Sequence, residues 1–184
     1  MKKLTSLFLV NIITLISIRL FAQDHVEAPK MPINPDSQKI MYREVVQEKG
    51  DPGYLYNKAM EWFNYYYINS ASLFKIQDKI NGKIEATGRM KIYYDDKDGN
   101  RMSAGLIVYT IRLEFKDDRY RYTVTDFNLK KASRYPLERW LNKEDPAFNP
   151  QWNNYLYQID TTMQRLDSSL KEKMKPVIEK PDEW

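Results

Sequence analysis

The side chains that most often carry out catalysis are scarce in this sequence. It contains no cysteine, which excludes disulfides, thiolate zinc sites and cysteine nucleophiles. Its single histidine, His25, stands in a proline-rich segment where no surrounding shell would orient it. Triads with a histidine base and metal sites with several histidines are therefore excluded. Among the common hydrolytic mechanisms, those that use a pair of carboxylates remain.

Three carboxylates stand at or near one long connection late in the chain: Asp126, Glu138 and Asp145. Two carboxylates at a suitable distance can act as general acid and general base. The sequence does not fix the distances between these three, and neighbouring acidic residues are common on protein surfaces. The sequence therefore assigns no catalytic residue, although a hydrolase that depends on carboxylates stays open as an alternative.

An acidic loop at residues 95–100, DDKDGN, has some of the spacing of a calcium loop. Counted from Asp96, Asp98 and Asn100 take the third and fifth positions. However, Arg101 stands where such a loop needs glycine, and Ile107 stands where it needs the closing glutamate. We therefore predict a polar hairpin loop, and no metal or other cofactor is expected.

A set of basic residues and one tyrosine occurs at alternate positions in segments with strand character, so its members share one face of a sheet. This candidate binding surface suits an anion or a glycan. Glu85, Glu114 and several threonines fall on the same face, so an ordinary solvated sheet face is the alternative. The surface comprises Arg89, Lys91, Tyr93, Arg112, Arg119 and Arg121.

Two further groups of residues concern exposed surface. Tyr65 and Tyr67 are expected to be exposed at a helix end, where they would suit contacts with a carbohydrate or a protein, or be ordinary surface residues. Val108 and Phe127 are expected to lie opposite each other on the face of the basic residues.

The element that positions most of these side chains is a β-hairpin predicted over residues 102–128. Residues 107–115 alternate between apolar and mainly polar types, and the alternation resumes after a two-residue loop at 117–118. On the polar face this register places Glu114 opposite Arg121, an opposite-charge pair. On the apolar face it pairs Phe115 with Tyr120, Leu113 with Tyr122 and Ile111 with Val124.

Strands are also expected at residues 40–48, 73–78 and 83–94. The second and third of these should form a hairpin with a three-residue loop at 80–82 and Gly82 left-handed. That loop would pair Ile76 with Ala86 and Phe74 with Gly88.

Two helices are expected, and each begins with a capping residue followed by proline. Asp51-Pro52 opens the first, whose apolar stripe runs from Leu55 to Tyr66. Asn149-Pro150 opens the second, which should reach about residue 174. The order is strand, helix, four strands, helix. The fold class is therefore α+β, with a five-stranded antiparallel curved sheet and two helices on one face.

The N-terminal residues have the features of a secretory signal. Lys2 and Lys3 precede a largely apolar run, and cleavage is expected after Ala22. An uncleaved anchor is the alternative, although Arg19 ends the apolar run too early for a full membrane span. We expect export to the periplasm or the cell exterior, without a transmembrane span after cleavage. A lipoprotein anchor is not expected, because there is no cysteine to lipidate.

The domain plan therefore has four parts: a signal at 1–22, a proline-rich leader at 23–38, one α+β domain at 39–175 and a loose tail at 176–184. The whole chain has 29 basic and 25 acidic residues. Since the signal holds three of the basic residues and no acid, the remainder has 26 against 25. The excess of positive charge lies mostly in the signal, so no nucleic-acid partner is expected.

Three runs in the domain resemble a family of exported proteins from gut-type Gram-negative bacteria: residues 39–46, 55–63 and 115–122. That family carries a domain of unknown function with a fold like that of the TATA-binding protein (TBP-like). The resemblance covers about 39–128, residues 136–141 also look familiar, and the helix at 150–174 completes the domain. Asp118 stands where the family pattern has glycine. The resemblance implies the same order of elements and no activity, and its TBP-like shape does not imply DNA binding.

We therefore expect an exported, non-enzymatic binding or interaction domain of the bacterial envelope, whose partner is an unidentified envelope protein or glycan. The alternative is a carboxylate-dependent hydrolase acting on an envelope polymer or glycan.

Overall fold

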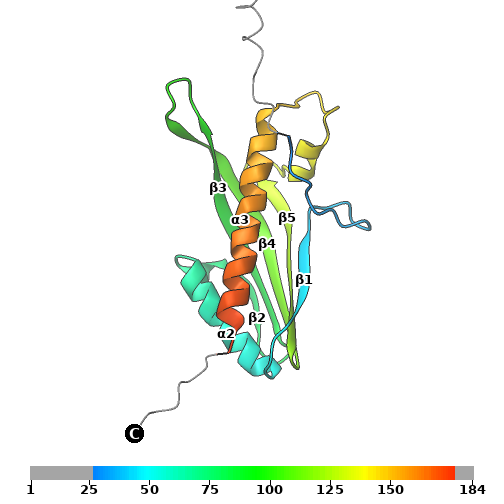
Figure 1. The fold of residues 1–184 in the computed structure, drawn as a ribbon, viewed down its shortest axis with the longest axis vertical. Coiled ribbons are helices and arrows are strands. Elements are labelled where there is room, and N and C mark those ends of the chain that lie inside the picture. The colour runs from blue at the N-terminus through cyan, green and yellow to red at the C-terminus, as the bar shows by residue number, and fades with distance from the viewer. Residues whose placement is uncertain (1–26, 177–184) are drawn as a thin grey trace, which may run out of the picture.

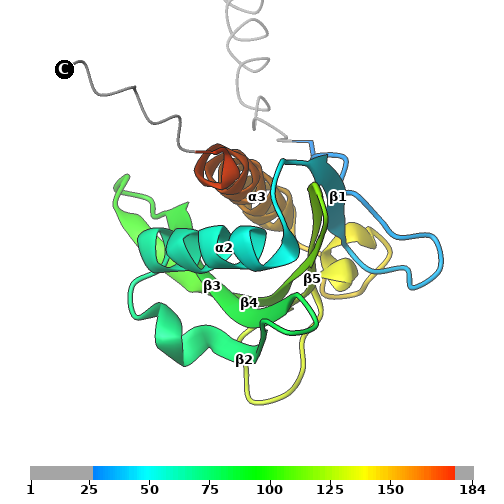
Figure 2. The ribbon, with the colours of Figure 1, turned by 90° about the horizontal axis from the view of Figure 1, so that it is seen from below.

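The computed structural model describes residues 27–176 as one antiparallel sheet with two long helices on one of its faces (Figures 1 and 2). Strand order across the sheet is β1-β5-β4-β3-β2. This confirms the predicted α+β fold. The predicted signal at residues 1–22 lies outside the described residues. The elements are β1 (Tyr42–Gln47), α2 (Pro52–Tyr66), β2 (Phe74–Asp78), β3 (Lys83–Asp95), β4 (Arg101–Lys116), β5 (Arg119–Leu129) and α3 (Gln151–Met174), with short 3-10 helices η2 (Ser70–Leu73) and η3 (Leu137–Leu141).

The β4–β5 hairpin has the predicted register. Phe115 pairs with Tyr120, and Glu114 pairs with Arg121. Asp118 adopts a positive φ of 57° at the turn, a conformation that usually favours glycine. Its carboxylate accepts a hydrogen bond from the backbone N–H of Gly50 at 3.1 Å, and its own N–H donates to the Gly50 carbonyl at 2.9 Å. These bonds join the turn to the loop between β1 and α2.

Both helices lie on the same face of the curved sheet, which we call the covered face (Figure 2). Asp51 caps α2 by accepting a hydrogen bond from the N–H of Tyr54 at 2.8 Å, as its sequence position predicts. Trp62 of α2 is fully buried and donates its indole N–H to the hydroxyl of Ser169 on α3 at 3.1 Å. Burying one large apolar side chain contributes about 1.5–3 kcal/mol to stability. The many apolar residues buried on this face are therefore the main source of the stability of the fold.

Gly88 of β3 makes room for an aromatic ring. Its cross-strand neighbour Tyr109 lies over it, and a Cβ atom at residue 88 would come 2.0 Å from Cε2 of that ring. The Tyr109 hydroxyl reaches the hydroxyl of Tyr67 at the end of α2, 3.0 Å away. The glycine therefore allows a side chain of β4 to fold across β3 and join the sheet to the helix.

The β2–β3 hairpin departs from its predicted register. Gly82 is left-handed as expected, with φ 60°. The loop nevertheless holds four residues, because Asp78 accepts hydrogen bonds from the N–H and side-chain amide of Asn81 and pairs with Lys83. The predicted pairs Ile76–Ala86 and Phe74–Gly88 are wrong. Observed instead are Ile76–Glu85 and Phe74–Ala86, with an irregularity between them. The longer loop sets Ile76 opposite Glu85 and leaves it 46% exposed.

Phe127 lies in the core, whereas the sequence predicted it on the opposite face beside Val108. Asp126 has a positive φ of 58° and forms a β-bulge. The bulge separates the pair Thr110–Thr125 from the pair Val108–Asn128, so the strand gains one residue. Phe127 consequently turns inward and packs against the rings of Tyr42 and Tyr109.

The segment predicted as a proline-rich leader, residues 23–38, is described from residue 27, and part of it packs against the domain. Met31 is only 7% exposed. Ile33 forms an antiparallel bridge with Ile40, and the N–H of Met41 donates to the Pro32 carbonyl at 2.9 Å. Within residues 27–176, no helix is both long enough and apolar enough to cross a membrane.

Candidate functional site

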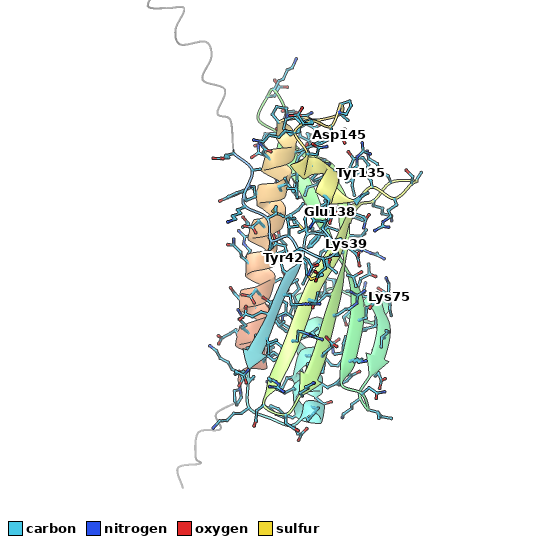
Figure 3. The ribbon with its side chains drawn as sticks, turned by 90° about the vertical axis from the view of Figure 1, so that its right-hand side faces the viewer. Lys39, Tyr42, Lys75, Tyr135, Glu138 and Asp145 are labelled. Atoms are coloured by element: carbon cyan, nitrogen blue, oxygen red, sulfur yellow. The ribbon has the colours of Figure 1, made fainter. Side chains whose placement is uncertain are left out.

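The face of the sheet away from α2 and α3, which we call the open face, carries the candidate binding surface. Lys75 of β2 stands on the far side of the sheet from α3 (Figure 3). The connection after β5 passes beneath this face (Figure 2). The two hollows described below lie on it. The side chains of the open face include Val45, Ile76, Lys83, Glu85, Thr87, Arg89, Lys91, Val108, Thr110, Arg112, Glu114, Lys116, Arg119, Arg121, Thr123 and Thr125.

Arg112 takes part in a chain of ion pairs across the middle of this face. Its Nε lies 2.7 Å from Oε2 of Glu85 on β3, and its Nη2 lies 3.9 Å from Oδ2 of Asp126 on β5. The other oxygen of Asp126 is 2.5 Å from Nζ of Lys39. The Arg112 charge is thus shared between two carboxylates, which leaves little of it for a ligand.

Arg121 is also paired within the sheet. Its Nε and Nη2 both donate to Oε2 of Glu114, at 2.8 and 2.5 Å. The two residues are direct cross-strand partners in the predicted register. Both are partly exposed, and such a pair contributes about 0.2–1 kcal/mol to stability. The pair fixes the arginine on the sheet and lowers the net charge that this part of the face presents.

Arg119 lies in a more basic part of the open face. Together with Arg121 it lines a pocket of about 310 Å³ at the ends of the β4–β5 and β2–β3 hairpins. Arg119 and Lys116 form no ion pair with any residue in 27–176. The pocket has four cationic side chains and one carboxylate, and Val45, 52% exposed, adds an apolar patch at its edge. Its charged lining residues are Lys83, Lys116, Arg119, Arg121 and Glu114.

Two of these residues, Lys83 and Lys116, were not among the predicted site residues. The predicted register already paired Lys116 with Arg119 and put Lys83 on the polar face. What the sequence did not show is that the tips of two separate hairpins come together, because β3 pairs with β4 so that Lys83 lies opposite Glu114. Knowing that Lys83 pairs with Glu114 would have placed Lys83 and Lys116 in the same pocket.

Arg89 and Lys91 stand further along β3, and both are exposed. Within residues 27–176, neither forms an ion pair. Tyr93, two residues on, is covered by another cation, because Cζ of Arg101 lies 4.2 Å from the centre of its ring. The six predicted residues therefore do not form one site. Arg119 and Arg121 share a pocket, Arg89 and Lys91 form a second basic stretch, and Arg112 and Tyr93 are each engaged by neighbours.

A second hollow of about 380 Å³ lies under the connection that follows β5. Lys75 and Arg134 bring positive charge to it, and Asp126 brings a negative charge that Lys39 and Arg112 already balance. Its lining is otherwise largely polar and includes Thr87, Thr110 and Asn128. This hollow has a less one-sided charge than the pocket at the hairpin tips.

The three candidate carboxylates are each bound by other groups. Asp126 is paired as described above, and Glu138 accepts the N–H of Ile40 at 2.9 Å. Asp145 accepts the N–H of Ala147 at 2.9 Å and three hydrogen bonds from the Arg139 guanidinium. The Ala147 N–H and then the Arg139 guanidinium hold the pKa of Asp145 below its usual value. An ionised carboxylate held in this way stabilises the connection and is poorly suited to donate a proton.

Asp96 organises the acidic loop from within. Its Oδ1 accepts the backbone N–H groups of Asp98 at 2.9 Å and Asn100 at 2.8 Å. The bonds from Asn100 are the main reason why the pKa of Asp96 lies below its usual value. In the part of the chain that the structure describes, no group of three or more acidic or histidine side chains is placed to hold a metal ion.

The tyrosines at the end of α2 have different environments. Tyr65 is 75% exposed, as predicted, while Tyr66 stacks on Trp62. The prediction that Tyr67 is exposed is wrong, because its hydroxyl pairs with that of Tyr109. Burial, reinforced by Tyr109, raises the pKa of Tyr67 far above its usual value. The helix ends at residue 66, so Tyr67 leaves the helical stripe and turns toward the sheet.

Comparison with known families and structures places the domain. Residues 42–130 match the family described as "Domain of unknown function (DUF4468) with TBP-like fold". A crystal structure of a DUF4468 family protein from Bacteroides ovatus is similar, with a TM-score of 0.63, 13% identity, and coverage of 85% of this chain and 97% of that one. A TBP-like protein from Parabacteroides distasonis has a TM-score of 0.54 and 15% identity, with coverage of 77% and 97%. At these identities the likeness concerns the fold alone. No curated protein matches the sequence.

Proposed function

We propose that this chain, which carries a DUF4468 domain of TBP-like fold over residues 42–130, is a non-enzymatic binding module whose open face holds an anionic ligand. The observation that carries the proposal is the pocket at the hairpin tips. It gathers four cationic side chains around one carboxylate, and Lys116 and Arg119 have no ion-pair partner in residues 27–176. Positive charges without ion-pair partners, gathered in one hollow, attract and orient anionic groups.

The composition of the pocket suits a ligand with several carboxylates or sulfates next to some apolar surface. Arg119 can present two N–H groups to an anionic oxygen pair, whereas Lys83 and Lys116 act as point charges. Arg121 adds positive charge beside them while it stays bound to Glu114. Val45 supplies the apolar contact. An acidic glycan and an acidic protein segment both have this chemistry.

The carboxylates argue for binding without catalysis. Asp126 forms an ion pair with a lysine, Glu138 accepts a backbone N–H, and Asp145 forms an ion pair with an arginine. None of the three lines the pocket at the hairpin tips. A hydrolase would need two of them free and facing one ligand site.

We also propose that the protein works outside the cytoplasm. The support is the sequence of residues 1–22, with its basic start, apolar run and small residue at the expected cut. N-terminal sequencing of protein from the periplasmic fraction tests this. A mature chain that begins at Gln23 supports export, and an intact Met1 in the cytoplasmic fraction would refute it.

The binding proposal is tested by titrating the protein with defined anions at physiological salt. The probes are a hexaglutamate peptide, a hexamer of galacturonic acid and a short DNA duplex. We expect one of the two carboxylate probes to bind, and the variant Lys116→Glu with Arg119→Glu to weaken its binding at least tenfold. The matched control is Lys97→Glu with Lys143→Glu, which makes the same charge change at exposed loop positions away from the pocket.

The comparison of the two double variants decides the matter. Equal losses in both would mean that net charge, and no site, attracts the probe. Binding of the DNA duplex in preference to both carboxylate probes would contradict the proposed ligand class, and so would the absence of binding at millimolar concentration.

A further inference from the structure

Half of β3 forms an open edge of the sheet. β2 pairs with β3 only as far as the pair Phe74–Ala86, although β3 continues to Asp95. In Figure 1 the upper half of β3 has β4 on one side and no strand on the other. The stretch from residue 87 to residue 91 lies just beyond the end of β2. A strand with one free side presents a row of backbone donors and acceptors.

Two hydrogen bonds identify which residues of β3 point to that side. The Gly82 carbonyl accepts the N–H of Phe115 on β4, so even-numbered residues of β3 direct their backbone groups toward β4. Tyr93 does the opposite: its N–H and C=O are both bound by the side-chain amide of Gln158 on α3, at 3.0 and 2.8 Å. Because the direction alternates along a strand, Arg89 and Lys91 also direct their N–H and C=O to the open edge.

Within residues 27–176, no side chain and no backbone group from outside the sheet forms a hydrogen bond with the N–H or C=O of Arg89 or Lys91. Gln158 closes the edge at Tyr93, and β2, together with η2 before it, closes the lower end. The open part therefore has the length of at most about five residues, roughly 17 Å at the usual rise of a strand. Both open residues also carry exposed basic side chains without an ion pair in the described part of the chain.

The charges decide what kind of strand fits. A second copy of this chain, pairing antiparallel about Met90, would set Arg89 against Lys91 of its partner and repel it. A strand with acidic residues at alternate positions would set a carboxylate beside each cation while its backbone fills the open ladder. Backbone pairing then supplies affinity, and the cross-strand charges supply selectivity.

We propose that the β3 edge at residues 87–91 binds an extended acidic segment of another protein by strand addition. Arg89 and Lys91 would pair with two acidic residues of that segment that are separated by one residue. This site is separate from the pocket at the hairpin tips and does not depend on an anion binding there.

The test uses amide hydrogen exchange by NMR and a synthetic seven-residue peptide in which glutamate alternates with valine. In the free protein, the amides of Arg89 and Lys91 should exchange fast, while those of Gly88 and Met90, which face β4, should be protected. The peptide should slow exchange at Arg89 and Lys91 at least tenfold. A matched peptide with N-methyl groups on the amides that face β3 should produce no protection.

Charge variants provide the second arm. Arg89→Glu with Lys91→Glu should lose the glutamate peptide and gain a peptide with lysine in place of glutamate. Lys116→Glu with Arg119→Glu should bind the glutamate peptide at the edge as before, which separates this proposal from the pocket.

Three results would overturn the proposal. Slow exchange at Arg89 and Lys91 in the free protein would mean that this chain or a second copy already covers the edge. Equal binding of the N-methylated peptide would reduce the interaction to charge attraction. If millimolar peptide does not slow amide exchange at Arg89 and Lys91, the edge does not bind a strand. The two cations would then serve only to prevent edge-to-edge association.

Discussion

The two faces of the sheet use their side chains in different ways. On the covered face, contacts are specific in shape: Gly88 has no side chain because the ring of Tyr109 lies there, and Tyr109 in turn meets Tyr67. On the open face, some charges are paired across strands, as in Glu114–Arg121, and others, such as Lys116, have no ion-pair partner in residues 27–176. The covered face therefore determines stability, and the unpaired part of the open face is available for a ligand.

The largest effect is expected at the closest contact of the covered face. Gly88→Ala would place a Cβ 2.0 Å from the Tyr109 ring, and the ring would have to leave its position. Overpacking of this kind costs about 1–3 kcal/mol, and we expect the upper end, about 3 kcal/mol, in urea unfolding. The control Gly53→Ala, in the first turn of α2, would place its Cβ 3.2 Å from Oδ1 of Asp51, and we expect it to change stability by less than about 1 kcal/mol. If Gly88→Ala is as stable as the wild type, the close packing of the Tyr109 ring over residue 88 does not contribute to stability.

The hydroxyl pair between α2 and β4 should have the next largest effect. Tyr67→Phe or Tyr109→Phe leaves the other hydroxyl buried without a partner, which costs about 1–3 kcal/mol. The double variant removes both hydroxyls and should cost less than the sum of the two single changes. Chemical unfolding of the four proteins gives the coupling energy. Strict additivity would mean that the two hydroxyls do not depend on each other.

The bond between α3 and the end of the open edge should have a smaller effect. Gln158→Ala removes the amide that binds the backbone of Tyr93, and we expect a loss of about 1 kcal/mol. The amide of Tyr93 should then exchange as fast as that of Lys91. Gln164→Ala, at an exposed position of the same helix, is the control and should leave the exchange at Tyr93 unchanged. Continued protection of Tyr93 in the first variant would show that another group closes the edge.

The smallest effects on stability are expected on the open face. Arg121→Ala breaks the pair with Glu114 and should cost about 0.5 kcal/mol, as for a partly exposed pair. Lys116→Ala, in the same pocket but without an ion pair in the described part of the chain, should cost less than that. A loss of several kcal/mol for Lys116→Ala would mean that the pocket is part of the structural core.

Much of this fold was predictable from the sequence because its local signals are strong. The alternation in β4 and β5 fixed a register that the structure confirms from Lys116–Arg119 to Ile111–Val124. Asp51-Pro52 marked the start of α2 in the same way. Such signals depend on residues that are neighbours in the sequence, so they do not depend on contacts between distant parts of the chain.

The incorrect predictions depend on single backbone features or on distant neighbours. The positive φ of Asp126 moved Phe127 into the core. Aspartate adopts positive φ more often than most residues, but an aspartate within an alternating strand does not by itself indicate a bulge. The hydrogen bonds of Asp78 to Asn81 lengthened one turn and exposed Ile76. The pocket could not be assembled beforehand, since it joins the tips of two hairpins whose mutual pairing became known only from the structure.

The division between a covered face that holds the fold and an open face that binds is tested most directly by NMR titration of the protein labelled with ¹⁵N, with the shift of every backbone amide followed. Hexaglutamate, the galacturonic acid hexamer and the alternating glutamate–valine peptide are added to separate samples. We predict that one of the first two probes shifts residues that line the hairpin-tip pocket, such as Lys116 and Arg119, and that the third shifts the β3 edge, with little change in α2 and α3. Shifts centred on the helices, or no shifts with any probe up to millimolar concentration, would contradict this account.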